Sequence, residues 1–126
     1  MKEKILIADD DGLMRMLIRT TLEADGGQFD IYEAKNGADA LEKARLIKPQ
    51  ILILDVMMPG ITGYDVCKKL KDSPETRGIY VLFLTCRGGE MSRKTVDLCG
   101  GDDFMVKPFQ SGDLEEKVYK VLGLAA

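Results

Sequence analysis

The 126-residue chain contains no histidine, only three cysteines and no long hydrophobic run. Without histidine, it cannot perform Ser–His or Cys–His catalysis, hold zinc through imidazole or carry a phosphohistidine. The cysteines, Cys67, Cys86 and Cys99, are far apart and form no C-x-x-C pair, which indicates reduced thiols in a cytosolic protein. No apolar run approaches the roughly 18 residues of a membrane span, and ILIA is too short for a signal-peptide core.

The net charge of the chain is also low. A formal net charge of −3 gives no general attraction for nucleic acid or for an anionic membrane, and no segment is a basic recognition helix for DNA. The hydrophobic content of 45% and the charged content of 31% are typical of an ordinary globular protein. We therefore expect one cytoplasmic domain over residues 1–126, without a direct nucleic-acid or membrane partner.

Short apolar runs alternate with stretches of helical spacing along the whole chain. The apolar runs predict strands at KILIA (4–8), FDIYEA (29–34), QILIL (50–54), YVLFL (80–84) and DFMV (103–106). The intervening segments predict helices over about 13–22, 40–47, 63–73, 89–99 and 114–122. This alternation predicts an α/β fold of the (βα)₅ type, with a doubly wound, flavodoxin-like parallel sheet in the strand order 2-1-3-4-5.

Polar side chains follow four of the predicted strands, at the point where each strand ends. They are, in chain order, Asp9, Asp10, Asp11, Asp55, Thr85 and Lys107. In an open parallel sheet, ligands bind beyond the carboxyl ends of the strands. The four strands are neighbours in the predicted order, so their ends lie within about 15 Å of one another. We expect the carboxylates, the hydroxyl and the ammonium group to share one shallow site.

A site of this composition suits a divalent cation and a phosphoryl group. Converging carboxylates need a cation, and an all-oxygen donor set suits Mg²⁺, for which Mn²⁺ can substitute. A carboxylate beside such an ion can act as a nucleophile and form an aspartyl phosphate. Taken singly, an aspartate after a strand is most often a helix N-cap or a turn residue. The coincidence of polar residues at four strand ends favours the phosphoryl site.

These motifs resemble the receiver domain of two-component response regulators. The resemblance rests on the acidic pair after the first strand, on LDVMMPG with Gly63 further on, on a threonine closing the fourth strand and on KPF after the fifth. It covers about residues 4–122. It implies a signalling domain rather than an enzyme, which takes its phosphoryl group from a histidine on a sensor histidine kinase or phosphotransfer protein. It also implies self-phosphorylation from small phosphodonors and slow autodephosphorylation.

The resemblance assigns roles to the acidic residues. It implies that Asp55 is the phosphoacceptor. Asp9 and Asp10 would hold Mg²⁺, with Asp55 and the backbone carbonyl of Met57 completing the protein ligands. We interpret Asp11 as a first-turn charge favoured by the helix dipole rather than as a ligand.

The remaining motif residues would carry the switch. Lys107 would pair with Asp55 and then with the phosphoryl oxygen, aimed by a cis bond before Pro108. Thr85 would hydrogen-bond the phosphoryl group, and Phe104 would swing inward as Thr85 moves, unless it is a simple core aromatic. The face of the fourth helix, fifth strand and fifth helix would then signal to a downstream protein or an output domain, or form a phosphorylation-dependent homodimer.

Some positions depart from the commoner family pattern. Cys86 stands where a smaller residue is frequent, although an inert, semi-buried thiol is the simpler interpretation. Met57 and Arg87 stand two residues after the phosphoacceptor and the threonine, at positions that border the attacking water in such domains. We expect their bulk to slow self-dephosphorylation.

Two other classes of function also fit parts of the sequence. ILIADDDGL matches the D-x-D-G motif of haloacid-dehalogenase-type phosphatases, with Asp9 as nucleophile and Asp11 as acid/base. In those enzymes the lysine precedes the second acidic motif, whereas Lys107 follows GDD here, and Asp55 is left without a role. A degenerate receiver used only for docking would not need the complete acidic, threonine and lysine set. The chain ends at KVLGLAA, which leaves open a stand-alone receiver and the front of a longer regulator.

Overall fold

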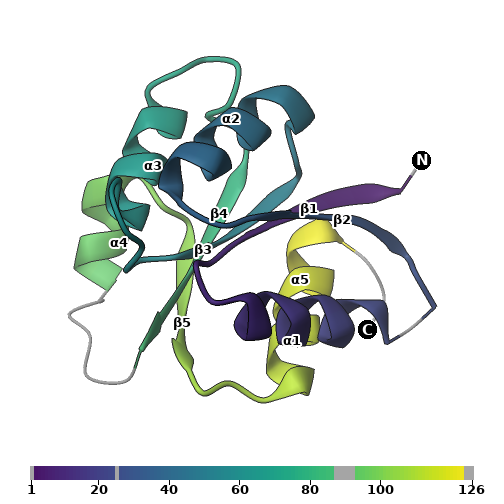
Figure 1. The fold of residues 1–126 in the computed structure, drawn as a ribbon. Coiled ribbons are helices and arrows are strands. Elements are labelled where there is room, and N and C mark those ends of the chain that lie inside the picture. The colour runs from purple at the N-terminus through teal and green to yellow at the C-terminus, as the bar shows by residue number, and fades with distance from the viewer. Residues whose placement is uncertain (1, 25, 87–92, 124–126) are drawn as a thin grey trace.

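The computed structural model describes residues 2–24, 26–86 and 93–123, in which five strands alternate with five helices (Figure 1). The strands are β1 (Glu3–Ala8), β2 (Phe29–Ala34), β3 (Ile51–Asp55), β4 (Tyr80–Cys86) and β5 (Asp103–Lys107). The helices are α1 (Gly12–Glu23), α2 (Gly37–Ile47), α3 (Gly63–Lys71), α4 (Arg93–Cys99) and α5 (Ser111–Leu122). The strands pair in parallel in the order β2-β1-β3-β4-β5, which confirms the predicted flavodoxin-like fold.

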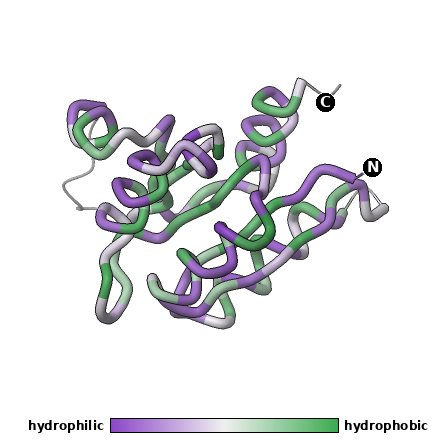
Figure 2. Tube along the Cα trace, turned by 90° about the horizontal axis from the view of Figure 1, so that it is seen from above, coloured by the Kyte–Doolittle hydropathy of each residue, from purple (hydrophilic) through white to green (hydrophobic). Residues whose placement is uncertain are grey.

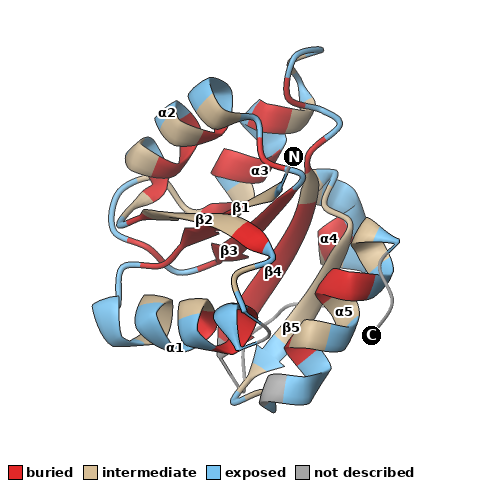
Figure 3. Cartoon of the chain, turned by 90° about the vertical axis from the view of Figure 1, so that its right-hand side faces the viewer, coloured by how far each residue is buried: buried red, intermediate tan, exposed pale blue. Residues whose placement is uncertain are grey.

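Helices cover both faces of the sheet, and each face has its own apolar core. α2, α3 and α4 lie on one face, and α1 and α5 lie on the other (Figure 1). Along β3, Leu52 and Leu54 point to the first core, while Ile51 and Ile53 point to the second. Successive side chains in a strand point to opposite faces, so a strand covered on both sides is apolar throughout. Figure 3 shows buried residues along the length of β3 and β4.

The helices are amphipathic, as their spacing predicts. Hydrophobic and hydrophilic residues alternate along them in Figure 2, and buried residues occupy their inner sides in Figure 3. In the part of the chain that is described, no helix combines the length and the apolar character that crossing a bilayer requires.

Two glycines bring loops close to the carboxyl edge of the sheet. A Cβ atom on Gly63 would lie 2.4 Å from the carbonyl oxygen of Asp55, and one on Gly37 would lie 2.4 Å from that of Ile61. The Gly63 N–H also donates to the carbonyl of Val56 at 2.9 Å. Because only glycine fits against Asp55, the loop after β3 can fold back and α3 can begin directly beside the end of the strand.

Most observed boundaries differ from the predicted ones by a few residues. α2 and α5 each begin three residues before the predicted start, at Gly37 and Ser111. β4 continues through Thr85 to Cys86, because these residues pair with Val106 and Lys107 of β5. α3 ends at Lys71 rather than at residue 73, and Asp72 serves as its C-cap. The first part of the fourth predicted helix, at residues 89–92, lies outside the described residues.

Candidate functional site

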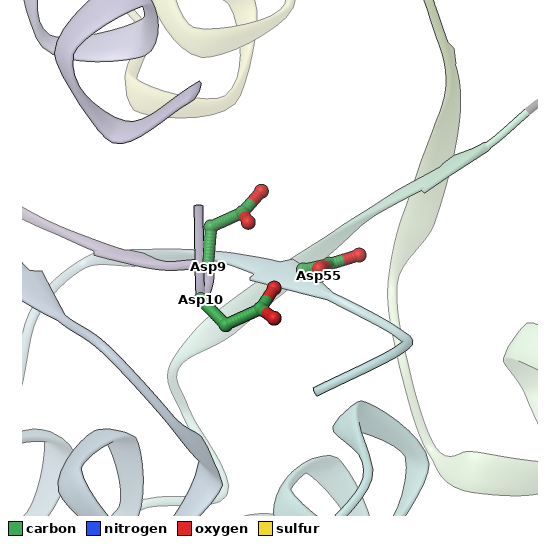
Figure 4. Close-up of side chains that lie close together, drawn as sticks. All are labelled: Asp9, Asp10 and Asp55. Carbon is green, nitrogen blue, oxygen red and sulfur yellow. The ribbon is translucent and has the colours of Figure 1, made fainter. Parts of the chain in front are cut away.

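Three aspartates meet at the carboxyl edge of the sheet. Asp9 and Asp10 follow β1, and Asp55 is the last residue of the neighbouring strand β3. One carboxylate oxygen of each residue lies within 4.8 Å of those of the other two. Figure 4 shows the three side chains extending to the same side of the strand ends. The structure therefore brings together three acidic residues that the sequence predicts in one site.

The carboxylate of Asp9 is buried and hydrogen-bonded on both oxygens. Its Oδ2 accepts from Lys107 Nζ at 2.9 Å, and its Oδ1 accepts from the Asp11 N–H at 2.9 Å. Asp11 Oδ1 in turn accepts from the Leu13 N–H at 3.0 Å, which makes Asp11 the N-cap of α1. Asp11 thus precedes the helix instead of lying in its first turn, because Gly12 begins α1.

Asp55 is 6% exposed and close to other charges. Its pKa is raised from an ordinary value of 3.8 to about 6, chiefly by burial and then by the negative charge of Asp9. Lys107, whose Nζ lies 3.6 Å from Asp55 Oδ1, lowers this pKa in part. The Met57 N–H donates to the same oxygen at 3.4 Å. One ammonium group is therefore shared between two buried carboxylates, and it lies nearer to Asp9 than to Asp55.

The donor set of this cluster fits Mg²⁺. Its oxygens are carboxylate oxygens, and hard cations such as Mg²⁺ prefer oxygen ligands while keeping several waters. Three carboxylates surround a single lysine ammonium group, so the cluster carries an excess of negative charge. Asp10 is exposed and lines a hollow of about 570 Å³ beside the loops after β2 and β3. This exposed side gives a cation room for its waters and for a further ligand.

The threonine and the aromatic residue of the predicted switch lie on the same face of the sheet. Thr85 is buried and follows Leu84, which pairs with Asp55 in the β3–β4 register. Phe104 pairs with Phe83 and is partly buried against the core under α2, α3 and α4. Thr85 lies two residues after Phe83 along β4, so its side chain faces the same core.

Three further predicted positions lie around the site. The peptide bond between Lys107 and Pro108 is cis, which is the isomer that the family resemblance implies. Met57 is 72% exposed beside Asp55. Arg87 and the side chain of Cys86 lie outside the described part of the structure.

Two charged residues near the site are not among those that the sequence motifs single out. Arg15 Nη1 donates to the carbonyl oxygen of Asp9 at 2.6 Å, and Arg15 Nε donates to Glu33 Oε1 at 3.0 Å. The available signal in the sequence was weak: a glutamate near the end of the second strand run and an arginine early in the first helix. Neither indicates a contact between them, since they are far apart along the chain.

The sequence pattern of one protein family, the response regulator receiver domain, matches residues 5–119. The phosphate regulon transcriptional regulatory protein PhoB of Rhizobium meliloti is 36% identical over 122 residues, which are 97% of this chain and 53% of PhoB. The probable transcriptional regulator ycf27 of Porphyra purpurea is 37% identical over 121 residues, 96% of this chain and 48% of ycf27. The chain thus spans about half the length of these curated relatives.

Solved structures of similar proteins have the same fold. A putative response regulator from Chloroflexus aurantiacus has a TM-score of 0.88 and 30% sequence identity, over 98% of this chain and 99% of that chain. The chemotaxis protein CheY4 of Vibrio cholerae has a TM-score of 0.86 and 26% identity, over 96% of this chain and 99% of that chain.

Proposed function

The chain belongs to the response regulator receiver domain family of two-component signalling, and we propose that Asp55 is the residue that accepts its phosphoryl group. The observation that carries this proposal is the position of Asp55. It ends the central strand β3, is nearly buried, and has Lys107 and two other carboxylates around its side chain. A carboxylate in this setting is held in one place for attack on an incoming phosphorus atom.

The divalent cation of this reaction would be held by Asp9, Asp10 and Asp55, together with the backbone carbonyl of Met57. The three carboxylate oxygens within 4.8 Å of one another support this assignment. When bound, Mg²⁺ or Mn²⁺ would neutralise the carboxylates and the negative charge of the phosphoryl oxygens. The hydrogen bonds that Asp9 accepts keep its carboxylate in a fixed orientation toward this position.

The phosphoryl group would come from a phosphohistidine of a sensor histidine kinase or phosphotransfer protein, or from a small acyl phosphate. The donor histidine belongs to the partner, because this chain contains none. A carboxylate oxygen of Asp55 attacks phosphorus, the bond from phosphorus to the donor breaks, and an aspartyl phosphate forms. Because the pKa of Asp55 is about 6, its carboxylate is mostly ionised at neutral pH and can attack. Lys107 donates hydrogen bonds to the transferred oxygens.

The signal would leave the site through Thr85 and Phe104. The new phosphoryl oxygens accept a hydrogen bond from the Thr85 hydroxyl, and Phe104 moves into the space that Thr85 vacates. Both residues face the core under α4, which supports a coupled movement. The α4–β5–α5 face then shifts between two conformations that a downstream protein, an output domain or a second copy of the chain distinguishes.

Met57 would affect how long the phosphoryl group persists. Its side chain is 72% exposed next to Asp55, and we propose that its bulk obstructs the approach of water. With Arg87 at the corresponding place after Thr85, we expect the variant M57N/R87A to lose the phosphoryl group faster than the wild type. The decay of the phosphorylated protein, followed by intact mass, measures this lifetime. An unchanged lifetime would show that these side chains do not restrict water.

Intact mass spectrometry after incubation with Mg²⁺ and acetyl phosphate tests the proposed function. We expect one labile phosphoryl adduct, which is absent in D55N and strongly reduced in D9N. D11N is the matched control, because asparagine caps a helix as well as aspartate does and the adduct should persist. Turnover of the donor without an adduct, lost in D9N, would instead indicate the phosphatase. Neither adduct nor turnover would indicate a docking module.

A further inference from the structure

Arg15 connects the acidic cluster to the end of β2. Its side chain is 20% exposed and donates in two directions, from Nη1 to the Asp9 carbonyl at 2.6 Å and from Nε to Glu33 Oε1 at 3.0 Å. Both bonds use the same planar guanidinium group. The position of the Asp9 carbonyl is therefore tied to the position of the Glu33 carboxylate.

Glu33 is itself held firmly, so it can anchor Arg15. Its Oε2 accepts from Arg19 Nε at 2.7 Å, and Arg19 Nη2 donates to the Ile31 carbonyl at 3.0 Å. The carbonyl of Glu33 accepts from Lys43. The hydrogen bond from Arg19, aided by that from Arg15, holds the pKa of Glu33 below its ordinary value despite partial burial. Glu33 is thus ionised at neutral pH and keeps both arginines in place.

The main chain of Asp9 is fixed on both sides. Its N–H donates to the Ala34 carbonyl at 3.2 Å, and its carbonyl oxygen accepts from Arg15. That carbonyl belongs to the peptide group that leads into Asp10. Because a peptide group is planar, the orientation of this carbonyl sets the direction in which the chain continues to Asp10.

We propose that Arg15 is a positioning residue for the divalent-cation site. By holding the peptide group between Asp9 and Asp10, it sets the direction from which the Asp10 carboxylate meets that of Asp55. This inference rests on the proposed function, which assigns the cation to these carboxylates. The role needs a guanidinium, because the single ammonium of a lysine does not reproduce the planar fork that donates to both partners.

The charge of Arg15 and its position predict different results, which makes the inference testable. A positive charge near the site opposes the binding of a cation, so removing that charge alone would tighten binding. R15K keeps the charge and removes the two-directional contact. If Arg15 acted only through its charge, R15K would bind the cation as the wild type does. If it acts by position, R15K binds more weakly.

Calorimetric titration of the intact chain with MgCl₂, without any phosphodonor, distinguishes these outcomes. We expect R15K to bind Mg²⁺ roughly tenfold more weakly, the lower end of the effect of removing a group that orients a metal ligand. R19K is the matched control, since Arg19 shares Glu33 but donates to Ile31 rather than to Asp9. A lysine at position 19 can still donate to Glu33, so the affinity of R19K should match the wild type, and thermal unfolding reports any loss of stability in either variant.

Each of the following results would overturn the inference. R15K could bind Mg²⁺ as tightly as the wild type, or R19K could weaken binding as much as R15K, which would indicate a general effect on α1 and β2. If R15K does not fold, E33A replaces it, since alanine removes the carboxylate oxygen that accepts from Arg15. An E33A affinity equal to that of the wild type then excludes the role. If the wild type itself binds no Mg²⁺, the proposed cation site fails together with the inference.

Discussion

Two lysines form ion pairs with aspartates at opposite edges of the sheet, and their surroundings differ. At the amino edge, Lys71 Nζ donates to Asp102 Oδ2 at 3.0 Å. It also donates to the carbonyl oxygens of Arg77 and Ile79, at 3.1 and 2.6 Å. Asp102 Oδ2 accepts a second hydrogen bond, from the Val81 N–H at 2.8 Å. The three protons of the ammonium group are used, and each pairs with an acceptor of the surrounding chain.

At the carboxyl edge, a single lysine lies among three carboxylates. Lys107 lies 2.9 Å from Asp9 and 3.6 Å from Asp55, and Asp10 adds a third carboxylate. The pair at the amino edge ties the start of β4 to the loop before β5. The cluster at the carboxyl edge keeps an excess of negative charge, which a bound cation would neutralise. Under the proposed function, similar residue types would serve stability at one edge and chemistry at the other.

Replacing Lys107 should have the largest effect on the reaction. K107M removes the donor to the transferred oxygens, and we expect the initial rate of adduct formation to fall by about 100-fold, as for other donors to a developing charge. The rate is measured by intact mass at fixed Mg²⁺ and acetyl phosphate. K71M is the matched control at the other edge, and its rate should match the wild type. Equal losses in the two variants would remove the functional distinction between the edges.

Replacing Lys71 should affect stability instead. K71M leaves Asp102 and two carbonyl groups without their shared donor, and we expect a loss of about 2 kcal/mol in the free energy of unfolding. Urea denaturation measures this loss. K69M, an exposed position on the same helix, should stay close to the wild type. If K69M destabilised the domain as much as K71M, the network at the amino edge would not be its cause.

The raised pKa of Asp55 should also affect how the free energy of unfolding depends on pH. Because its folded pKa of about 6 lies above its ordinary 3.8, the folded protein binds more protons than the unfolded chain between these values. In EDTA, stability should therefore fall as the pH rises through about 4 to 6. D55N should lack this component. Urea denaturation of both proteins at about pH 5 and pH 7 measures it, and parallel profiles would contradict a raised pKa.

The fold and the main members of the site follow from local patterns in the sequence. Continuous apolar runs predict β3 and β4, because strands covered on both faces are apolar throughout. Asp55 and Lys107 could be placed because the ends of parallel strands meet at one edge. The ends of elements were harder to predict. β4 extends past Thr85 because β5 continues the ladder beside it, and the sequence of β4 alone does not contain that information.

The contacts between distant charged residues could not be predicted in this way. Lys71 and Asp102 are 31 positions apart, and Arg15 and Glu33 are 18 apart. Their pairing depends on how each helix packs against the sheet, which apolar spacing does not fix to the accuracy of a hydrogen bond. The sharing of Lys107 between Asp9 and Asp55 could not be predicted either, because the motif alone suggests a pair with Asp55.

Mapping the phosphorylated residue tests the central claim most directly. Borohydride reduces an aspartyl phosphate to homoserine, so peptide mass mapping after treatment with acetyl phosphate and borohydride locates the acceptor. The account predicts that Asp55 is converted to homoserine and that Asp9, Asp10 and Asp11 remain unchanged. Conversion of Asp9 with Asp55 intact would contradict it and would place the nucleophile on β1.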